Sequence, residues 1–316
     1  MTFSRLFFIV VALSCFSLTK AQEPAPIPHS NPVMVYMDHL EAPVLIGEKS
    51  DSHAFKRTWL WDSTWREIKC KVNPPPGIGH AAAYDSKRKR VVMFGGSKSI
   101  SYDGSTWLFD GENWTELKIE GPRPRRWHQM VYDEVNDHII LFGGELKGLA
   151  TANDTWIFDG TSWKEIDAKG PKRKQHGMVY DPVQDHTIMY GGNVADYRKA
   201  EIRTLNDTWV FKDQQWKPLE IASPFQRHGF GLGFDNNKGW PVLFGGRSNI
   251  MLDDTWVLSK GKWALIDNKG PTRTGRPAMI YHKKLKKFLM FGAYSEKHQY
   301  QNEFWELNIR TWTQLK

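Results

Sequence analysis

Cysteine is scarce in this chain, which carries two cysteines among its 316 residues. Cys15 lies in the apolar N-terminal segment, so Cys70 is the single thiol that remains if that segment is removed. One thiol cannot form an intrachain disulfide, and stability must therefore come from a packed core. Long apolar runs are scarce as well. Beyond the first 16 residues no stretch is long enough for a membrane helix, so we expect no membrane span.

The familiar sequence motifs of catalysis are also missing. The chain holds no Gly-x-Ser-x-Gly, no His-Glu-x-x-His, no phosphate loop and no dinucleotide fingerprint. Apolar residues do not recur with the period of a long helix but form short runs such as 91–94 and 139–142, which are typical of buried strands. With 15 Trp, 17 Phe and 26 Gly, the composition favours an all-β protein with many tight turns.

The charge is modest and dispersed. The whole chain has a formal net charge of +8, and its first 21 residues contain Arg5 and Lys20 but no acids, which leaves +6 for the remainder. One cluster of lysines, at 283–287, falls in a predicted hairpin turn, where a solvated tip explains it. No basic stripe is interleaved with stacking aromatics, so nucleic acid is not an expected partner.

The N-terminus has the pattern of a secretory signal peptide. Arg5 supplies the positive charge, residues 6–16 form an apolar run too short to span a bilayer, and Thr19 and Ala21 are the small residues that a signal peptidase reads. We expect cleavage of residues 1–21 after Ala21 and a secreted or periplasmic protein. A lipoprotein acylated at Cys15 is the weaker alternative, because Ala12 stands where such motifs have Leu. The proline-rich residues 22–32 are expected to form a linker.

Four landmarks recur through the rest of the chain. Glycines that end apolar runs are spaced 48, 48, 48, 54 and 47 residues apart, at Gly47, Gly95, Gly143, Gly191, Gly245 and Gly292. An aromatic residue stands eleven before each glycine, at Tyr36, Tyr84, Tyr132, Tyr180, Phe234 and Tyr281. Two tryptophans follow each glycine, at 59 and 65, 107 and 114, 156 and 163, 209 and 216, 256 and 263, and 305 and 312. Landmarks that keep register through six units indicate a structural repeat.

This pattern resembles the Kelch repeat over residues 33–316. The resemblance rests on the paired glycines at 95–96, 143–144, 191–192 and 245–246, each followed by an aromatic, a turn and a Trp, as in residues 154–163. The first unit has Gly47-Glu48 in place of paired glycines but keeps its other landmarks. The Kelch family implies an all-β fold, a six-bladed β-propeller of four-stranded antiparallel blades with one blade per repeat.

Local signals in the third repeat agree with such a blade. Residues 127–132 and 138–142 are predicted strands joined by a polar turn, and 154–158 and 163–166 are two more joined by the tight-hairpin pair Asp159-Gly160. Stacking such sheets around an axis buries both of their apolar faces, with the tryptophan pairs where blades meet. Each repeat supplies its own four strands by this count. Closure of the ring by residues 33–37 remains an open alternative.

Ligands of Kelch-type propellers bind at one end of the central channel, and the resemblance carries this expectation to the loops of this chain by position. The loops after the glycines begin at Glu48, Ser97, Glu145, Asn193, Arg247 and Tyr294 and differ in length. Uneven loops on one face of a repeat array often mark its binding face. Together with the loops that lead into the first strands, they predict a channel-mouth site of Glu48, His80, Arg126, Trp127, His128, Glu145, Arg173, His176, Arg227, Arg247 and Tyr294.

Histidines recur at one repeat position, at His80, His128 and His176, and with a two-residue offset at His228. A metal or catalytic cluster is one interpretation. A repeated position, however, spreads side chains around a ring instead of converging them on one ion, and the Arg-x-x-His spacing is common in Kelch-like sequences. We expect these histidines to belong to the repeat, with no metal and no cofactor. Galactose oxidase has a Kelch-type propeller with a Tyr–Cys copper site, but Cys70 has no obvious tyrosine partner.

Two functions fit these observations. The first is a monomeric, non-catalytic module that binds a protein or a glycan at the channel mouth, where Trp127 beside Arg126 could stack on a sugar, anchor a peptide or pack against the next blade. The alternative is a carbohydrate-active enzyme similar to a sialic-acid mutarotase or a polysaccharide lyase, in which arginines neutralise a carboxylate and His or Tyr acts as acid or base. The missing catalytic motifs and the uneven loops favour the binding module.

Overall fold

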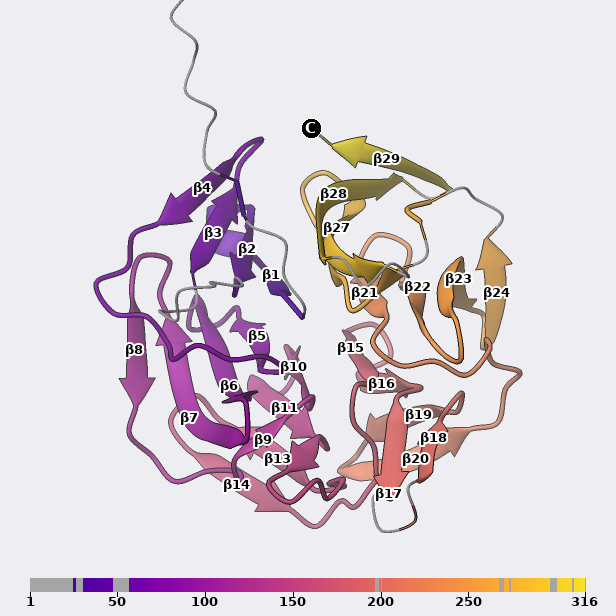
Figure 1. Cartoon of the computed structure of the whole chain (residues 1–316), viewed down its shortest axis with the longest axis horizontal. Helices are drawn as coiled ribbons and strands as arrows, with labels where there is room; N and C mark the ends of the chain where they lie inside the picture. Colours follow the sequence, from indigo (N-terminus) through magenta and orange to yellow (C-terminus); the bar gives the residue numbers. More distant parts are fainter. Residues whose placement is uncertain are drawn as a thin grey trace, which may run out of the picture.

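The computed structural model describes residues 25–26, 31–47, 57–196, 199, 201–266, 270–272, 274–295, 300–308 and 310–315. In this part of the chain strands form six four-stranded antiparallel blades around a central channel (Figure 1), which confirms the predicted propeller. A short 3₁₀ helix, η1 (Asp38–Leu40), follows the first strand, and none of the helices described is long and apolar enough to cross a membrane. The predicted signal peptide, most of the linker and Glu48 lie outside the described residues.

Each blade is one contiguous repeat. Blade 1 consists of β1 (Val33–Met37), β2 (Ala42–Ile46), β3 (Thr58–Trp61) and β4 (Trp65–Ile68), and blade 2 of β5 (Ala81–Asp85), β6 (Arg90–Lys98), β7 (Ser101–Phe109) and β8 (Trp114–Leu117). Blade 3 consists of β10 (Gln129–Asp133), β11 (His138–Phe142), β13 (Thr155–Phe158) and β14 (Trp163–Ile166). Blade 4 consists of β15 (Gly177–Asp181), β16 (His186–Tyr190), β19 (Thr208–Lys212) and β20 (Gln215–Leu219).

The last two blades follow the same order. Blade 5 consists of β21 (Gly231–Asp235), β22 (Trp240–Arg247), β23 (Met251–Ser259) and β24 (Lys262–Ile266), and blade 6 of β26 (Ala278–His282), β27 (Lys287–Ser295), β28 (Tyr300–Asn308) and β29 (Thr311–Leu315). Short strands add to the blades at the ends of their connections. β9 (Arg125–Arg126) pairs with β12 (Glu145–Leu146), β17 (Asn193–Asp196) with β18 (Glu201–Thr204), and β25 (Thr274–Gly275) with β27.

The strands of the third repeat lie close to their predicted bounds. β11 and β14 match the prediction, and β13 begins one residue later than predicted. The first strand, β10, begins at Gln129 instead of residue 127. The cause is the left-handed backbone of Trp127, whose φ of 57° cannot be part of a strand.

Ring closure uses no strand exchange. β1 pairs with β2 of its own blade, from Val33 opposite Ile46 to Met37 opposite Ala42, and β29 pairs with β28. The N-terminal strand therefore completes blade 1 and adds nothing to blade 6. In Figure 1 these two blades flank the closing junction at the top of the ring.

The second tryptophan of a blade joins it to the preceding blade. In blades 2 to 6 its indole Nε1 donates a hydrogen bond to a buried threonine hydroxyl on the third strand of the preceding blade. The bonds are Trp114 to Thr58 (2.8 Å), Trp163 to Thr106 (2.9 Å), Trp216 to Thr155 (3.0 Å), Trp263 to Thr208 (3.1 Å) and Trp312 to Thr255 (3.1 Å). Each buried ring contributes about 1.5–3 kcal/mol and each hydrogen bond about 1 kcal/mol to stability.

The junction between blades 6 and 1 is built differently. Phe304 stands opposite Leu315 as Thr255 stands opposite Ile266, so a phenyl ring takes the place of the hydroxyl. The ring centroid of Trp65 lies 5.1 Å from that of Phe304 and 5.3 Å from that of Phe291. Apolar side chains from both blades surround these rings. Side-chain packing therefore closes the propeller.

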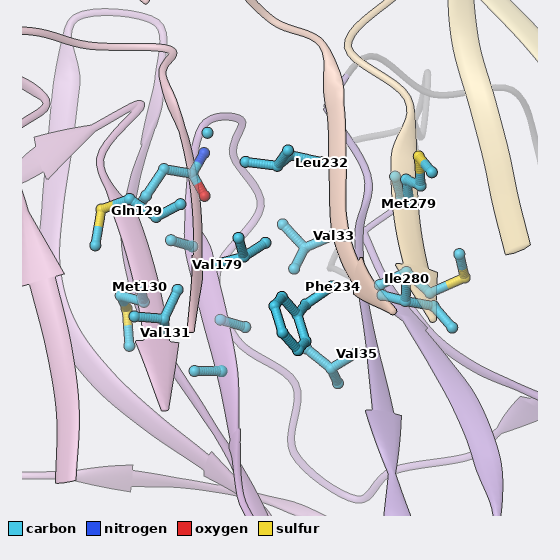
Figure 2. Close-up of a pocket in the computed structure, with 18 of the residues that line it drawn as sticks. Val33, Val35, Gln129, Met130, Val131, Val179, Leu232, Phe234, Met279 and Ile280 are labelled. Atoms are coloured by element: carbon cyan, nitrogen blue, oxygen red, sulfur yellow. The ribbon is translucent and has the colours of Figure 1, made fainter. Parts of the chain in front are cut away.

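The innermost strands enclose a central cavity of about 360 Å³. Figure 2 shows apolar side chains around it, among them Val33 and Val35 from β1, Val179 from β15, and Phe234 from β21. Each of these strands is the edge strand of its blade, so it has a side on which its backbone N–H and C=O groups make no ladder bonds. Such groups need polar partners, and the channel is therefore suited to water or to a polar ligand more than to a purely apolar one.

Candidate functional site

The two sets of loops singled out by the sequence meet at one end of the channel, which we call the mouth. In blades 2 to 6 the residue two after the landmark glycine pairs through its backbone with a residue of the connection that leads into the same blade. The pairs are Ile78 with Ser97, Arg126 with Glu145, Lys174 with Asn193, His228 with Arg247, and Gly275 with Tyr294. Four residues of the predicted site thus lie on one rim. Glu145, Arg247 and Tyr294 occupy equivalent places after the glycines, and Arg126 lies opposite Glu145.

A chain of backbone hydrogen bonds, here called the belt, runs around the mouth from blade 2 to blade 6. Its members are the next residues of the connections, and each has a left-handed backbone: φ is 72° at Gly79, 57° at Trp127, 54° at Gln175, 58° at Gly229 and 60° at Arg276. The N–H of each later member donates to the carbonyl of the member in the preceding blade, at N···O distances of 2.6, 2.9, 3.0 and 2.5 Å in chain order. A bulky residue pays about 1–3 kcal/mol for this conformation, so the belt holds Trp127 in a backbone state that it would not adopt alone.

The indole of Trp127 is surrounded by cations from three blades. The Arg126 guanidinium carbon lies 3.9 Å from the ring centroid, Lys174 Nζ lies 5.1 Å from it, and the Arg276 guanidinium carbon lies 5.7 Å from it. Positive groups at these distances are attracted to an aromatic face. The ring also packs on Gly79 so closely that a Cβ there would lie 2.6 Å from Cδ1 of the indole. The ring of Trp127 thus packs on the preceding blade, whereas the sequence-based alternative was packing against the next blade.

Glu145 is fully buried beside these cations and fixes two of them. Its Oε1 accepts hydrogen bonds from the Tyr102 hydroxyl (2.6 Å) and from Arg126 Nε (2.8 Å), and its Oε2 accepts one from Lys174 Nζ. Burial alone would raise the pKa of Glu145, but the hydrogen bonds from Lys174 and Tyr102 and the positive charge of Lys174 lower it below its usual value. Glu145 is therefore an ionised anchor for Arg126 and Lys174.

A small pocket of about 150 Å³ lies at the mouth between blades 5 and 6. His228, Arg247, Met251, Arg276 and Tyr294 line it, together with Gly229 and Gly275 of the backbone pairs and the belt. Burial, followed by the charges of Arg276 and Arg247, lowers the pKa of His228 to about 4, so this imidazole is neutral at physiological pH. Two arginines thus face one concave site, which suits an anionic group.

Two residues of the predicted site, Arg173 and Arg227, are held inside the blades instead of facing the mouth. With Arg125 they are fully buried, and each guanidinium pairs with one aspartate on two N···O contacts: Arg125 with Asp154 (2.8 and 2.7 Å), Arg173 with Asp207 (3.0 and 2.8 Å) and Arg227 with Asp254 (2.5 and 2.8 Å). Each also donates to the carbonyl of its blade's landmark glycine. We call these three pairs the clamps, and we leave Arg173 and Arg227 out of the candidate site.

The recurrent histidines are buried as well. His80, His128 and His176 are 4%, 1% and 2% exposed, and the last two rings pack on Phe94 and Phe142 of the preceding blades. Burial, followed by the charge of Arg125, lowers the pKa of His128 to about 3, and burial followed by Arg173 lowers that of His176 well below 6.5. In the described part of the chain no three His, Cys, Asp or Glu side chains gather as metal ligands do.

Blade 5 shows that a phenyl ring can take the place of the imidazole at this position. Phe230 lies four residues before Phe234, just as His128 lies four before Tyr132. The ring centroid of Phe230 is 5.5 Å from that of Tyr190 in blade 4. His228, which the sequence groups with the other histidines at an offset, instead holds the place of Arg126 and Lys174 in the backbone pairs. Counting from the aromatic landmark would have found this difference.

Three residues of the mouth were not part of the predicted site. Lys174 follows the clamp residue Arg173 and is equivalent to Arg126. Arg276 is the belt residue of blade 6 and is equivalent to Trp127. Aligning the later repeats on Arg126 and Trp127 would have identified both residues. Tyr102 lies on β7 and reaches Glu145 of the next blade, a contact that no sequence signal indicates. The predicted member Glu48 lies outside the described residues.

Comparison with known proteins agrees with the repeat. The family model for the KLHDC2/KLHL20/DRC7 Kelch-repeats domain matches residues 107–279. The dynein alpha chain of the flagellar outer arm from Chlamydomonas reinhardtii is 36% identical over 84 residues, which cover 25% of this chain and 2% of that protein. Dynein regulatory complex subunit 7 from the same organism is 34% identical over 88 residues, which cover 27% of this chain and 8% of that protein.

A third relative comes from a different kind of protein. The tRNA wybutosine-synthesizing protein 4 of Aspergillus fumigatus is 29% identical over 110 residues, which cover 31% of this chain and 10% of that protein. In each of these relatives the matched segment spans a tenth of the protein or less, so the likeness concerns the repeats alone. Because the family model matches more than half of the chain, and the described blades carry its repeat throughout, the protein belongs to the KLHDC2/KLHL20/DRC7 Kelch-repeats domain family.

Proposed function

We propose that this propeller is a protein-binding module whose mouth takes an acidic segment of its partner. The observation that carries the proposal is the gathering of Arg126, Lys174 and Arg276 around Trp127, with Arg247 in the adjoining pocket. Kelch propellers typically bind proteins, and the family assignment supports a ligand of that class. A large aromatic ring and arginines are the side chains that most often dominate protein interfaces.

Charge favours an acidic ligand over a neutral one. Among the described residues of the backbone pairs and the belt, Glu145 is the one acid, and it is buried against Arg126 and Lys174. Arg247 is exposed at the rim. Arginine binds carboxylates through two parallel hydrogen bonds, which gives both strength and geometry. A protein ligand is favoured over a glycan because the Arg126 guanidinium covers one face of the indole on which a sugar would stack.

The positions of the predicted residues do not favour the alternative, a carbohydrate-active enzyme. It requires Arg126, His128, Arg173, His176 and Arg247 to converge at the mouth. Arg173 is instead held in a clamp, His128 is buried against Phe94, and His176 lines the central cavity. The mouth keeps Arg126 and Arg247, with a buried, ion-paired Glu145 and a His228 of lowered pKa. This set binds a carboxylate but lacks an evident acid–base pair, so we do not carry the enzyme forward.

The test uses a Glu-rich peptide and its Gln-rich counterpart, both fluorescently labelled, in anisotropy titrations. We expect the Glu-rich peptide to bind more tightly, and the double variant Arg247→Glu/Arg276→Glu to weaken it by about tenfold or more, as loss of charged hydrogen bonds does. Lys164→Glu/Lys217→Glu, two exposed changes on β14 and β20 that alter the net charge by the same amount, is the matched control. Equal binding of the two peptides, or an equal loss in the control, would overturn the proposal.

We also propose that the protein is exported as a chain beginning at Gln22. The support is the signal-like N-terminus with Thr19 and Ala21 at the positions read by a signal peptidase. Intact-mass measurement of the protein recovered from the periplasm or the medium should give the mass of residues 22–316. A full-length chain, or one retained in the cytoplasm, would refute this.

A further inference from the structure

At the end of the channel opposite the mouth, aromatic residues from five blades form a circle. The fourth residue of the innermost strand is Tyr36 in blade 1, Tyr84 in blade 2, Tyr132 in blade 3, Tyr180 in blade 4 and Phe234 in blade 5. We call these five side chains the tyrosine ring. All five line both the central cavity and a pocket of about 180 Å³ at this end, so pocket and channel are continuous. At about 30 Å³ per water, the pocket has room for roughly six waters or one small organic molecule.

The phenols of the tyrosine ring are fixed by polar partners. The hydroxyl of Tyr132 donates to Asp137 Oδ1 (3.1 Å) and that of Tyr180 donates to Asp185 Oδ1 (2.7 Å). The hydroxyl of Tyr84 lies 2.8 Å from His39 Nδ1. Side chains held in this way lose little further freedom when a ligand arrives, which lowers the entropic cost of binding.

Two carboxylates, Asp38 and Glu134, line the pocket, and the two tyrosine hydroxyls point at Asp137 and Asp185. Asp137 is also paired with Lys87, so Glu134 is the carboxylate of the lining that no described cation balances. Burial, followed by hydrogen bonds to Asp185 and Asp133, raises the pKa of Tyr180. The one described cation that lines the pocket is Lys283, whose Nζ lies 2.9 Å from Asp38 Oδ2. The positive charge of Lys283 at this pocket is therefore paired with the carboxylate of Asp38.

We propose that the tyrosine ring binds a small alkylammonium ion. Aromatic rings attract such cations through their π faces, and several rings around one opening form the cage by which proteins recognise quaternary ammonium groups. The carboxylates at the rim add attraction that a neutral molecule of the same shape does not receive. This site lies at the other end of the channel from the acidic-peptide site, and neither proposal depends on the other.

The structural repeat alone could explain why aromatic residues occupy this end of the channel. Each unit has an aromatic at this position, and a purely structural role would explain the rings of Tyr36, Tyr84, Tyr132, Tyr180 and Phe234. A structural role alone would not make binding in the pocket depend on the charge of the added molecule. Nor would it make binding depend on substitutions that remove the charge of Glu134 or Lys283, which are both exposed. The experiment is designed on that difference.

Calorimetric titration with tetramethylammonium chloride, with tert-butanol as the neutral comparison, tests the site. We expect binding of the cation and none of the alcohol. Glu134→Gln should weaken binding and Lys283→Gln should strengthen it, each by about 2- to 5-fold at low salt. Arg247→Glu, at the mouth, should leave it unchanged, which separates this result from any failure of the peptide site.

Changes in the tyrosine ring complete the test. Tyr84→Leu should lower the affinity for tetramethylammonium by about 2- to 25-fold, which corresponds to about 0.5–2 kcal/mol for one cation–π contact. Tyr84→Phe keeps the aromatic ring and should retain binding, so the comparison stands even if the leucine variant folds poorly. Equal heats for the ion and the alcohol, no binding of the ion, or Glu134→Gln and Lys283→Gln acting in the same direction would overturn the proposal.

Discussion

Arg125 and Arg126 are adjacent in sequence, and the structure gives them opposite roles. Arg125 is fully buried in a clamp, with Asp154 on two contacts and the Gly143 carbonyl at 2.9 Å from its guanidinium. Arg126 is half-buried at the mouth against Glu145 and Trp127. Truncating each to alanine should therefore separate a loss of stability from a loss of binding.

The magnitude for Arg125→Ala follows from the contacts it removes. Burial alone would raise the pKa of Asp154, but the hydrogen bonds and charge of Arg125 lower it from 3.8 to about 2. That shift is equivalent to about 2 kcal/mol at neutral pH. The orphaned Gly143 carbonyl adds about 1–3 kcal/mol. The sum agrees with the roughly 3–5 kcal/mol that breaking a buried ion pair costs, and we expect a fall of this size in the free energy of unfolding.

Urea unfolding followed by tryptophan fluorescence measures this loss. Arg126→Ala is the matched control: Glu145 keeps its hydrogen bonds to Lys174 and Tyr102, so the loss of stability should stay below about 1.5 kcal/mol while the affinity for the Glu-rich peptide falls. The reasoning about the clamp fails if the two variants are equally unstable.

A double variant, Arg125→Met/Asp154→Leu, tests the charge argument directly. Replacing both members of a buried pair by apolar groups leaves no orphaned charge and should restore the part of the loss due to Asp154, about 2 kcal/mol, while the Gly143 carbonyl still lacks its donor. Because the folded-state pKa of Asp154 is lowered, its contribution is present above about pH 4 and is lost as the pH falls toward 2. The double variant should therefore lose less stability than the parent over that range, and an unchanged acid dependence would contradict the assignment.

Three further predictions concern the junctions between blades and the charges of the mouth. Trp216→Phe keeps most of the ring but loses the hydrogen bond to Thr155, so calorimetry should show a loss of about 1 kcal/mol, against about 3–5 kcal/mol for Trp216→Ala. His128→Phe should change stability at pH 7 by less than about 1.5 kcal/mol, because Phe230 already fills the equivalent place. Since the pKa of the buried His128 is about 3, the unfolded chain gains a proton first as the pH falls below about 6.5, so the parent should lose stability there and the phenylalanine variant should lose less. Binding of the Glu-rich peptide should weaken steeply with added salt, and a salt-independent affinity would argue against charge recognition at the mouth.

The propeller itself could be predicted because its signals repeat. The glycine spacing and the tryptophan pairs gave six blades, and the polar turns gave the bounds of β11 and β14. One repeat read alone would have been a short run of ambiguous strands. Six in register remove that ambiguity, because each landmark must serve the same packing role in every blade.

The mouth could be predicted only in part, since sequence does not say which of two neighbouring arginines is buried. Arg125 and Arg126 form a doublet with the same chemistry, and the register of β9 against β12 decides which one points into the blade. The belt could not be predicted from the sequence for a related reason. Its left-handed residues include Trp127, Gln175 and Arg276 besides two glycines, so no shared residue type marks the position. These features come from backbone conformation, which composition and spacing do not record.

The closing junction has a consequence for how the chain folds. Every blade pairs strands that are near neighbours in sequence, so most of the fold has low contact order and each blade can form soon after its residues leave the ribosome. Contact between blade 1 and blade 6 spans nearly the whole chain and must come last. Until then the apolar face of blade 1, with Met34, Leu45 and Trp59, stays uncovered and is the surface that a chaperone would be expected to bind during synthesis.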